Sequence, residues 1–596
     1  MNKKLIVWNL LAIGSSLLFS LLQLSFAGDI SLVAFPLSVL FVVWFAYESH
    51  IGLIKNLRPT KLSLVVKLLQ YLPYVLLASF VIRRAGITET AYWYDLVTVL
   101  LWVVVMVSSH GALYFLHRKR VFDKNPALKE VSNKSPKAPL PLVKKALFEA
   151  LDWVDAFVQA ICTVALINIF ILQLYEIPSE SMVSEFLVRD RVVGYKLDAG
   201  PKFPMSDVGL PEVRSYNRGD IVIFSNPHYS TDKDSQLKTF LSQLVYMLTL
   251  TTVNLNVDEN GELKADPLVK RITGVEGEQL VMQDGVLYSR TTETPSFTPV
   301  TEDATWANWN LASLPPDVLK KVQYVPLRPE EYDIMIQIEA DRKSLNFRDA
   351  LQEARDLVAR FEQVQSASRV SQSTVFNTNE YSGQNALFVY TFFSQADTTI
   401  RDMFYSNGGA EWFSSFMLEW ASSIPQAFPM DFEILIGGDM YTDAMFRQNL
   451  MLKLAFGRLA VRTAELLSQG VSTNTQSYDQ ERLEYMMQAQ NTAFYILNIN
   501  DMRNMGVFPP NDDKGDAQYI DKDHFFVMGD NRFNSLDMRH SYDRKRIPLT
   551  HLDSHSFYYD SNLAPQQIST DNILGTPVLR FFPFSRFGIP GSGGEK

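Results

Sequence analysis

Residues 156–182 read AFVQAICTVALINIFILQLYEIPSESM, and this stretch decides how the rest of the chain is organised. Residues 156–175 contain no Asp, Glu, Lys or Arg, and about 20 apolar residues are what an α-helix needs to cross a bilayer. Pro178 cannot continue a helix, so we expect the helix to stop before it. Ser179 and Ser181 come directly after it. The stretch therefore predicts a membrane anchor that presents two hydroxyl groups at the membrane surface.

Four further apolar runs precede this anchor. Each has about the length of a bilayer-spanning helix, and they lie at 5–26, 30–47, 62–82 and 96–116. One such run could be a buried core helix, but five runs within 175 residues make that interpretation poor. We expect residues 1–175 to form a membrane domain of about five helices, in which 156–175 anchors the C-terminal remainder of the chain.

Positive charge predicts the orientation of these spans. Lys3 and Lys4 precede the first run, three basic residues separate the second from the third, and nine Lys or Arg lie within 118–145. Cytoplasmic loops are enriched in Lys and Arg, which places everything after residue 175 on the outer, periplasmic side of the cytoplasmic membrane. Arg83 and Arg84 fall on the opposite side from the other basic groups and weaken the trend.

The first run also fits a second interpretation. Residues 1–28 have the basic start, apolar centre and small-residue end, at Ser25-Phe26-Ala27, of a cleaved signal peptide. The apolar run is longer than the roughly 7–15 residues usual for such peptides. This length favours an uncleaved span and leaves the rest of the topology unchanged.

Composition excludes several classes of function. The chain has 596 residues, a net charge of -10, eight histidines and one cysteine, Cys162. A nucleic-acid-binding domain is normally basic, so no nucleic-acid partner is predicted. One cysteine cannot form an intrachain disulfide or a cysteine-based metal site, and no His-Glu-x-x-His occurs. We therefore predict neither a metal nor another cofactor.

Four later stretches complete the pattern, although each is weak alone. Residues 190–195 and 218–224 are expected to form short β-branched strands with preceding turns. Residues 267–278 are expected to form a strand and a glycine-rich turn, and 525–539 contain a Gly-Asp-Asn-Arg sequence. Together, in this order and after a membrane span, they resemble the bacterial type I signal peptidase family. The resemblance covers the last span, 175 to about 290, and about 519 to 588.

The residues around Ser181 exclude the commoner ways of activating a serine. No histidine lies near it, and neither Gly-x-Ser-x-Gly nor Ser-x-x-Lys is formed around it. A serine–lysine dyad is a recognised alternative to the triad. By resemblance Ser181 is the nucleophile and Lys270 the general base. A free lysine titrates near ~10.4, so Lys270 must be buried to be neutral.

The same resemblance assigns the supporting residues. The backbone N–H of Ser181 and the Ser179 hydroxyl are the expected oxyanion donors, and Ser535 is expected to hydrogen-bond and orient Lys270. Two ion pairs are expected, Arg271 with Asp530 and Asp537 with Arg539. The residues expected around a shallow substrate pocket, with core packing as an equal alternative, are Ile177, Pro178, Met182, Phe186 and Val269.

The chain departs from the family pattern at six positions outside the expected dyad and oxyanion donors. They are Ser184, Glu185, Glu276, Glu278, Phe533 and Met538. Such differences bear on substrate preference more than on activity.

Two insertions are the larger departure from that pattern. A mainly β catalytic core is expected in two parts, 176–290 and 519–596, with a helical insertion at about 229–262 that either lies on the membrane or packs on the core. Between the two parts, 291–518 is expected to form a mainly helical domain, since 347–361, 446–467 and 478–497 have helical spacing of apolar residues. Docking an envelope protein or restricting substrate entry are the hypotheses for this domain.

The sequence thus predicts a multi-span membrane endopeptidase that removes signal peptides from exported preproteins at the outer face of the cytoplasmic membrane. Its expected partners are those preproteins and the lipid bilayer. Two alternatives stay open: a peptidase for a narrow substrate set, and a catalytically silent homologue that acts as a membrane scaffold. A transporter is a weaker interpretation, because ionisable residues within spans usually mark transport paths. The predicted spans contain few of them, with Lys67 and His110 as the exceptions.

Overall fold

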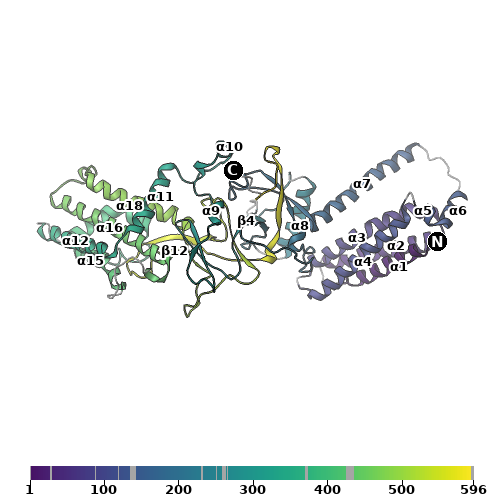
Figure 1. Ribbon diagram of the computed structural model, residues 1–596, viewed down its shortest axis with the longest axis horizontal. Coiled ribbons are helices and arrows are strands. Elements are labelled where there is room, and N and C mark those ends of the chain that lie inside the picture. The colour runs from purple at the N-terminus through teal and green to yellow at the C-terminus, as the bar shows by residue number, and fades with distance from the viewer. Residues whose placement is uncertain are drawn as a thin grey trace.

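The computed structural model is elongated, with three regions along its length (Figure 1). Helices α1–α4 lie at one end, the β-sheets in the middle, and a second group of helices, including α16, at the other end. The structure describes residues 2–26, 30–87, 89–117, 120–134, 142–229, 233–249, 252–257, 264, 266–368, 374–424 and 435–591.

The N-terminal region is a bundle of apolar helices. Within the described residues, five helical stretches are long and apolar enough to cross a membrane, which is the number that the sequence predicts. The Asn2 side chain caps the first of them by accepting from the Lys4 N–H at 2.9 Å. The helices are α1 (Lys3–Leu21), α2 (Ala34–Ala46, continued by a π-helix over Tyr47–Lys55), α3 (Leu62–Ala85), α4 (Tyr92–Leu116) and α7 (Leu142–Phe170).

Helix α7 differs from the predicted anchor at both ends. It ends at Phe170, not at residue 175, because residues 172–176 form strand β1 and pair with β2. Their backbone groups are therefore satisfied across a sheet, and Pro178 does not terminate the helix. It begins at Leu142 and includes Asp155, which accepts a hydrogen bond from the Tyr71 hydroxyl of α3 at 2.9 Å.

A seven-stranded antiparallel sheet forms the middle of the described structure. It joins segments from both ends of the chain, since β15 near the C-terminus lies between β2 and β3. The β-branched sequence of β3, Ile221–Phe224, suits a strand that is buried on both faces. In sheet order the strands are β1 (Leu172–Glu176), β2 (Arg191–Tyr195), β15 (Ile573–Phe582), β3 (Ile221–Phe224), β4 (Leu268–Gly274), β11 (His524–Met528) and β14 (Ile568–Ser569).

A smaller sheet packs beside it and shares its core. Among the described residues it has four strands, and its strand β10 follows the helical region in the sequence. Leu280 and Met282 pack against Ile272 and Phe526 of the larger sheet. The order is β10 (Met505–Phe508), β5 (Gln279–Gln283), β6 (Val286–Arg290) and β7 (Thr298–Pro299).

The far end of the molecule is helical and centres on α16. This helix has buried residues on all sides, as expected of a helix surrounded by others. The predicted stretches 347–361 and 446–467 lie within α12 and α16, and 478–497 begins two residues before α18. Polar side chains at Asn346, Asp439 and Asp479 cap these three helices. The main helices are α11 (Pro329–Ser344), α12 (Phe347–Ala367), α14 (Ala396–Tyr405), α15 (Gly409–Leu418), α16 (Met440–Ser468) and α18 (Gln480–Asn498).

Packing crosses the predicted boundaries at residues 291 and 518. The hairpin of β12 (His540–Pro548) and β13 (Tyr558–Leu563) lies in the predicted second part of the β core. Its Phe557 and Tyr559 nevertheless belong to the buried core of the helical region. The aromatic side chains of the hairpin pack against the apolar residues of the helical region. This contact joins residues far apart in the chain, so the spacing of residues within a strand does not predict it.

The first insertion contains one helix, α8 (Lys233–Leu248), among the residues described. It packs against α7 and α3, and its Phe240 packs against the apolar cluster of the candidate membrane helices. These contacts place the helix beside the N-terminal apolar helices, at the end of the bundle that faces the sheets (Figure 1). Its place on the membrane surface stays a prediction.

Candidate active site

Two distant segments bring Ser181 and Lys270 together. Ser181 lies in the loop that follows β1, and Lys270 is the third residue of β4, where it pairs with Val222 of β3. Lys270 Nζ donates a hydrogen bond to Ser181 Oγ at 2.7 Å. Both residues are buried, with 8% of Ser181 and 3% of Lys270 exposed. In its neutral form the same amine can accept the proton of the Ser181 hydroxyl along this contact.

Burial prepares Lys270 to act as a base. Loss of solvation lowers the pKa of Lys270 to about 8, although the charges of Asp537 and Asp530 act in the opposite direction. The cross-strand partner of Lys270, Val222, is fully buried in the apolar core that the two sheets share. At a pH near 8 a large fraction of the side chain is therefore the neutral amine that proton abstraction requires.

Candidate oxyanion donors stand beside the nucleophile. Ser179 Oγ lies 3.3 Å from Ser181 Oγ and donates to it. The backbone N–H of Ser181 donates to no acceptor in the part of the chain that the structure describes. Asn531 fixes the backbone of the loop that carries Ser181, because its N–H donates a hydrogen bond to Ser181 O at 3.0 Å. Its side-chain Nδ2 donates to Glu180 O, also at 3.0 Å.

Ser535 differs from its predicted role. Its hydroxyl is buried without a hydrogen-bond partner among the described residues, so the expected hydrogen bond to Lys270 is not formed. Lys270 Nζ bonds Ser181 instead. Ser535 lies behind the nucleophile, next to Gly529, where a Cβ on Gly529 would overlap both Ser535 Oγ and Ser181 O. The glycine is thus required for the close approach of the two segments.

We expect Gly529→Ala to lower the turnover number about 10²-fold, the effect of displacing a reacting group by about 1 Å. The added methyl group must push Ser181 away from Lys270 or push Ser535 aside. Steady-state cleavage rates in detergent measure this, with Gly588→Ala as the matched control because a Cβ there meets no atom within 4 Å. Equal rates for both variants would show that Gly529 does not determine the position of Ser181.

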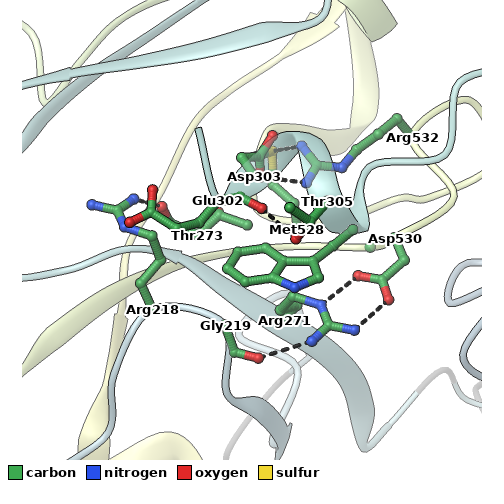
Figure 2. Close-up of polar contacts among 12 residues, drawn as sticks. Arg218, Gly219, Arg271, Thr273, Glu302, Asp303, Thr305, Met528, Asp530 and Arg532 are labelled. Atoms are coloured by element: carbon green, nitrogen blue, oxygen red, sulfur yellow. Dashed lines mark hydrogen bonds and ion pairs between the residues drawn. The ribbon is translucent and has the colours of Figure 1, made fainter. Parts of the chain in front are cut away.

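The two predicted ion pairs are present: one links β4 to the segment that follows β11, and the other lies within the loop between β11 and β12. Arg271 donates to both carboxylate oxygens of Asp530, at 2.8 and 2.7 Å, and to Gly219 O at 2.9 Å (Figure 2). Arg539 Nε lies 2.8 Å from Asp537 Oδ1. Burial acts to raise the pKa of Asp537, but Arg539 holds it below its usual range.

The predicted pocket residues divide into two groups. Ile177, Met182 and Phe186 are buried within the apolar cluster beside the dyad, which is the core-packing alternative. Val269 is half-buried against this cluster, and Pro178 is exposed. Only these last two could contact a substrate without rearrangement of the core.

Several residues around the site were given no role from the sequence. Asn531 is part of the Gly-Asp-Asn-Arg sequence, and this motif is the sequence feature from which a role for Asn531 could have been predicted. Asp303 and Asn308 lie in the predicted helical insertion, where no motif marks them. Asp303 forms a buried ion pair with Arg532 at 2.6 Å (Figure 2). Asn308 Nδ2 donates to Val183 O at 2.9 Å, two residues beyond the nucleophile.

Comparison with known proteins identifies a related family for part of the chain. Residues 150–380 match the family model described as signal peptidase, peptidase S26. A stretch of 138 residues is 26% identical to the signal peptidase I of Buchnera aphidicola subsp. Baizongia pistaciae (strain Bp), covering 22% of this chain and 38% of that protein. The chain therefore matches well under half the length of this relative. No solved structure matches the chain.

Proposed function

Residues 150–380 belong to the signal peptidase family, and from this premise we propose that the chain is a membrane-bound serine endopeptidase that removes signal peptides from exported preproteins. The observation that carries the proposal is the contact between buried Lys270 Nζ and Ser181 Oγ at 2.7 Å. Both residues lie inside the matched range. A scaffold that lacks activity would need neither the contact nor the burial of the lysine.

In the proposed reaction Ser181 Oγ attacks the scissile carbonyl carbon while neutral Lys270 accepts its proton along the 2.7 Å contact. The negative oxygen of the tetrahedral intermediate accepts from the Ser181 N–H and the Ser179 hydroxyl. The protonated lysine then gives its proton to the leaving amine, and the acyl-enzyme ester forms. Lys270 next takes a proton from the water that attacks the ester, and returns it to Ser181 Oγ when the ester C–O bond breaks, which restores the hydroxyl and the neutral amine.

The place of the site in the chain supports a preprotein as substrate. Ser181 follows the end of α7 at Phe170 by one short strand, so the nucleophile stays close to the end of a candidate membrane span. The distribution of Lys and Arg favours the outer side for this end. Signal peptides end in small residues of the Ala-x-Ala type, which need only shallow recognition surfaces.

The proposal is tested by incubating the full-length chain in detergent with a preprotein that bears an Ala-x-Ala site. We expect a single cleavage after the second alanine, identified by mass spectrometry of both products. Absence of cleavage across several preproteins would reject general signal peptide removal and favour the narrow-substrate or scaffold alternatives.

Activity is expected to rise with pH. Because the pKa of Lys270 is lowered to about 8, the neutral fraction of the lysine increases as pH rises through 8 and falls about tenfold for each pH unit below it. The acid limb of kcat/KM should therefore have an apparent pKa of about 8 and level off above it. A profile that stays flat down to pH 6 would show that Lys270 is not the base.

A further inference from the structure

A segment of the predicted insertion lies against the candidate dyad instead of within the helical region. We call residues 303–324 the bracing segment. It begins with the short helix α9 (Asp303–Trp306) and continues through η5 (Leu311–Ser313) and α10 (Pro316–Leu319). Its contacts are with the loop that carries Ser181 and with the segment after β11 that carries Asp530.

Asn308 is the central contact of the bracing segment. Its backbone N–H donates to Asp530 O at 2.7 Å, and its own carbonyl accepts from the Arg532 N–H at 3.2 Å. Its side-chain Nδ2 donates to Val183 O at 2.9 Å. One residue thus links the loop beyond the nucleophile to the segment 530–532, whose Asn531 bonds Ser181 O at 3.0 Å.

The rest of the bracing segment holds the same loop at other points. The Glu180 carboxylate, next to the nucleophile, accepts from the backbone N–H groups of Gln323 and Tyr324, the latter at 3.1 Å. Leu311 packs in a small buried cluster with Val183 and Leu187. The loop is therefore fixed by polar contacts near Ser181 and by apolar contacts beyond it.

Helix α9 covers the ion pair that supports the dyad. The Trp306 ring lies 5.1 Å from the guanidinium carbon of Arg271, within the range of a cation–π contact. A Cβ on Gly219 would lie 2.7 Å from this indole, so the glycine allows the ring to pack there. Asp303, at the start of the same helix, pairs with Arg532 (Figure 2). Helix α9 thus contacts both Arg271 on β4 and Arg532 in the segment after β11.

We propose that Asn308 is a positioning residue for the peptidase reaction, which holds the loop 179–183 so that Ser181 Oγ and Ser179 Oγ keep their places beside Lys270. This inference rests on the proposed function. Asn308 acts through Val183 and Asn531 and does not itself take part in proton transfer. The inserted segment would then serve catalysis directly, in addition to any role of the helical region.

Asn308→Asp tests the inference with a nearly isosteric change. A carboxylate cannot donate to Val183 O and repels it, so we expect kcat to fall about tenfold to 10²-fold while KM changes by less than about twofold. The matched control is Asn310→Asp, two residues away, where the side-chain oxygen that accepts from the Ala312 N–H at 3.1 Å is kept. If Asn308→Asp does not fold, Asn308→Ala removes the same donor without adding charge.

A second arm separates positioning from general destabilisation. If Asn308 acts through the loop that carries Ser179, its effect on kcat should shrink in a Ser179→Ala background, because the two changes damage the same feature. Additive losses, or a fall in kcat that tracks only the unfolded fraction measured by thermal unfolding, would overturn the positioning role.

Hydrogen exchange makes the test independent of activity. Backbone amides of 179–187 should exchange faster in Asn308→Asp than in wild type, and at the wild-type rate in Asn310→Asp. Unchanged exchange in both Asn308 variants would overturn the inference. If exchange accelerates but wild type cleaves no preprotein, Asn308 still positions the loop and it is the proposed function that fails.

Discussion

Ser181→Ala and Lys270→Met are each expected to abolish measurable cleavage, with a loss on the order of 10⁴–10⁶-fold in kcat. The first removes the attacking oxygen. The second keeps the length and apolar packing of the side chain but removes the amine that lies 2.7 Å from Ser181 Oγ. Cleavage of an Ala-x-Ala preprotein by purified variants in detergent measures both, with circular dichroism to show that they are folded.

Lys196→Met is a demanding control for the lysine change. Burial lowers the pKa of Lys196 to about 8, as it does for Lys270. However, Lys196 Nζ donates to Gln173 Oε1 at 3.1 Å, not to a serine. We expect this variant to cleave normally, since a lowered pKa without a nearby nucleophile gives no base catalysis. Activity retained in Lys270→Met but lost in Ser181→Ala would refute the assignment of Lys270 as base.

Ser179→Ala is expected to lower kcat by about 10²–10³-fold, the scale of losing one oxyanion donor. The Ser179 hydroxyl is 3.3 Å from Ser181 Oγ, close enough to reach an oxygen that develops on the carbon under attack. KM should change little, because the negative oxygen exists only in the transition state and the intermediate. Single-turnover cleavage rates measure the chemical step directly.

The control for this prediction is Ser184→Ala, which removes a hydroxyl from the same loop on the far side of the nucleophile. Its rate should stay within about twofold of wild type, because the half-buried Ser184 side chain forms no hydrogen bond with Ser179, Ser181 or Lys270 among the described residues. Equal turnover in wild type and Ser179→Ala would remove Ser179 from the mechanism and leave the Ser181 N–H as the proposed donor.

The sequence alone was sufficient to predict five apolar helices, because bilayer thickness sets a length that can be counted along the chain. It also predicted the helices of the far region, since apolar spacing is a local property. The pairing of Ser181 with Lys270 came from the resemblance, and the 2.7 Å contact between them is consistent with that expectation. In each case the information lies within a short stretch or a known motif.

Other features were decided only by the tertiary structure. Helix α7 ends at Phe170 because 172–176 pair with β2, and apolar composition does not distinguish a helix from a buried strand. Ser535 lies against Gly529 and forms no hydrogen bond with Lys270. The packing of the segment 529–535 against the loop that carries Ser181 decides which serine hydroxyl lies beside the lysine amine. Asn308 supports the nucleophile from an insertion that shows no motif. These outcomes depend on contacts between residues far apart in the chain, whose combined energy overrides local preference.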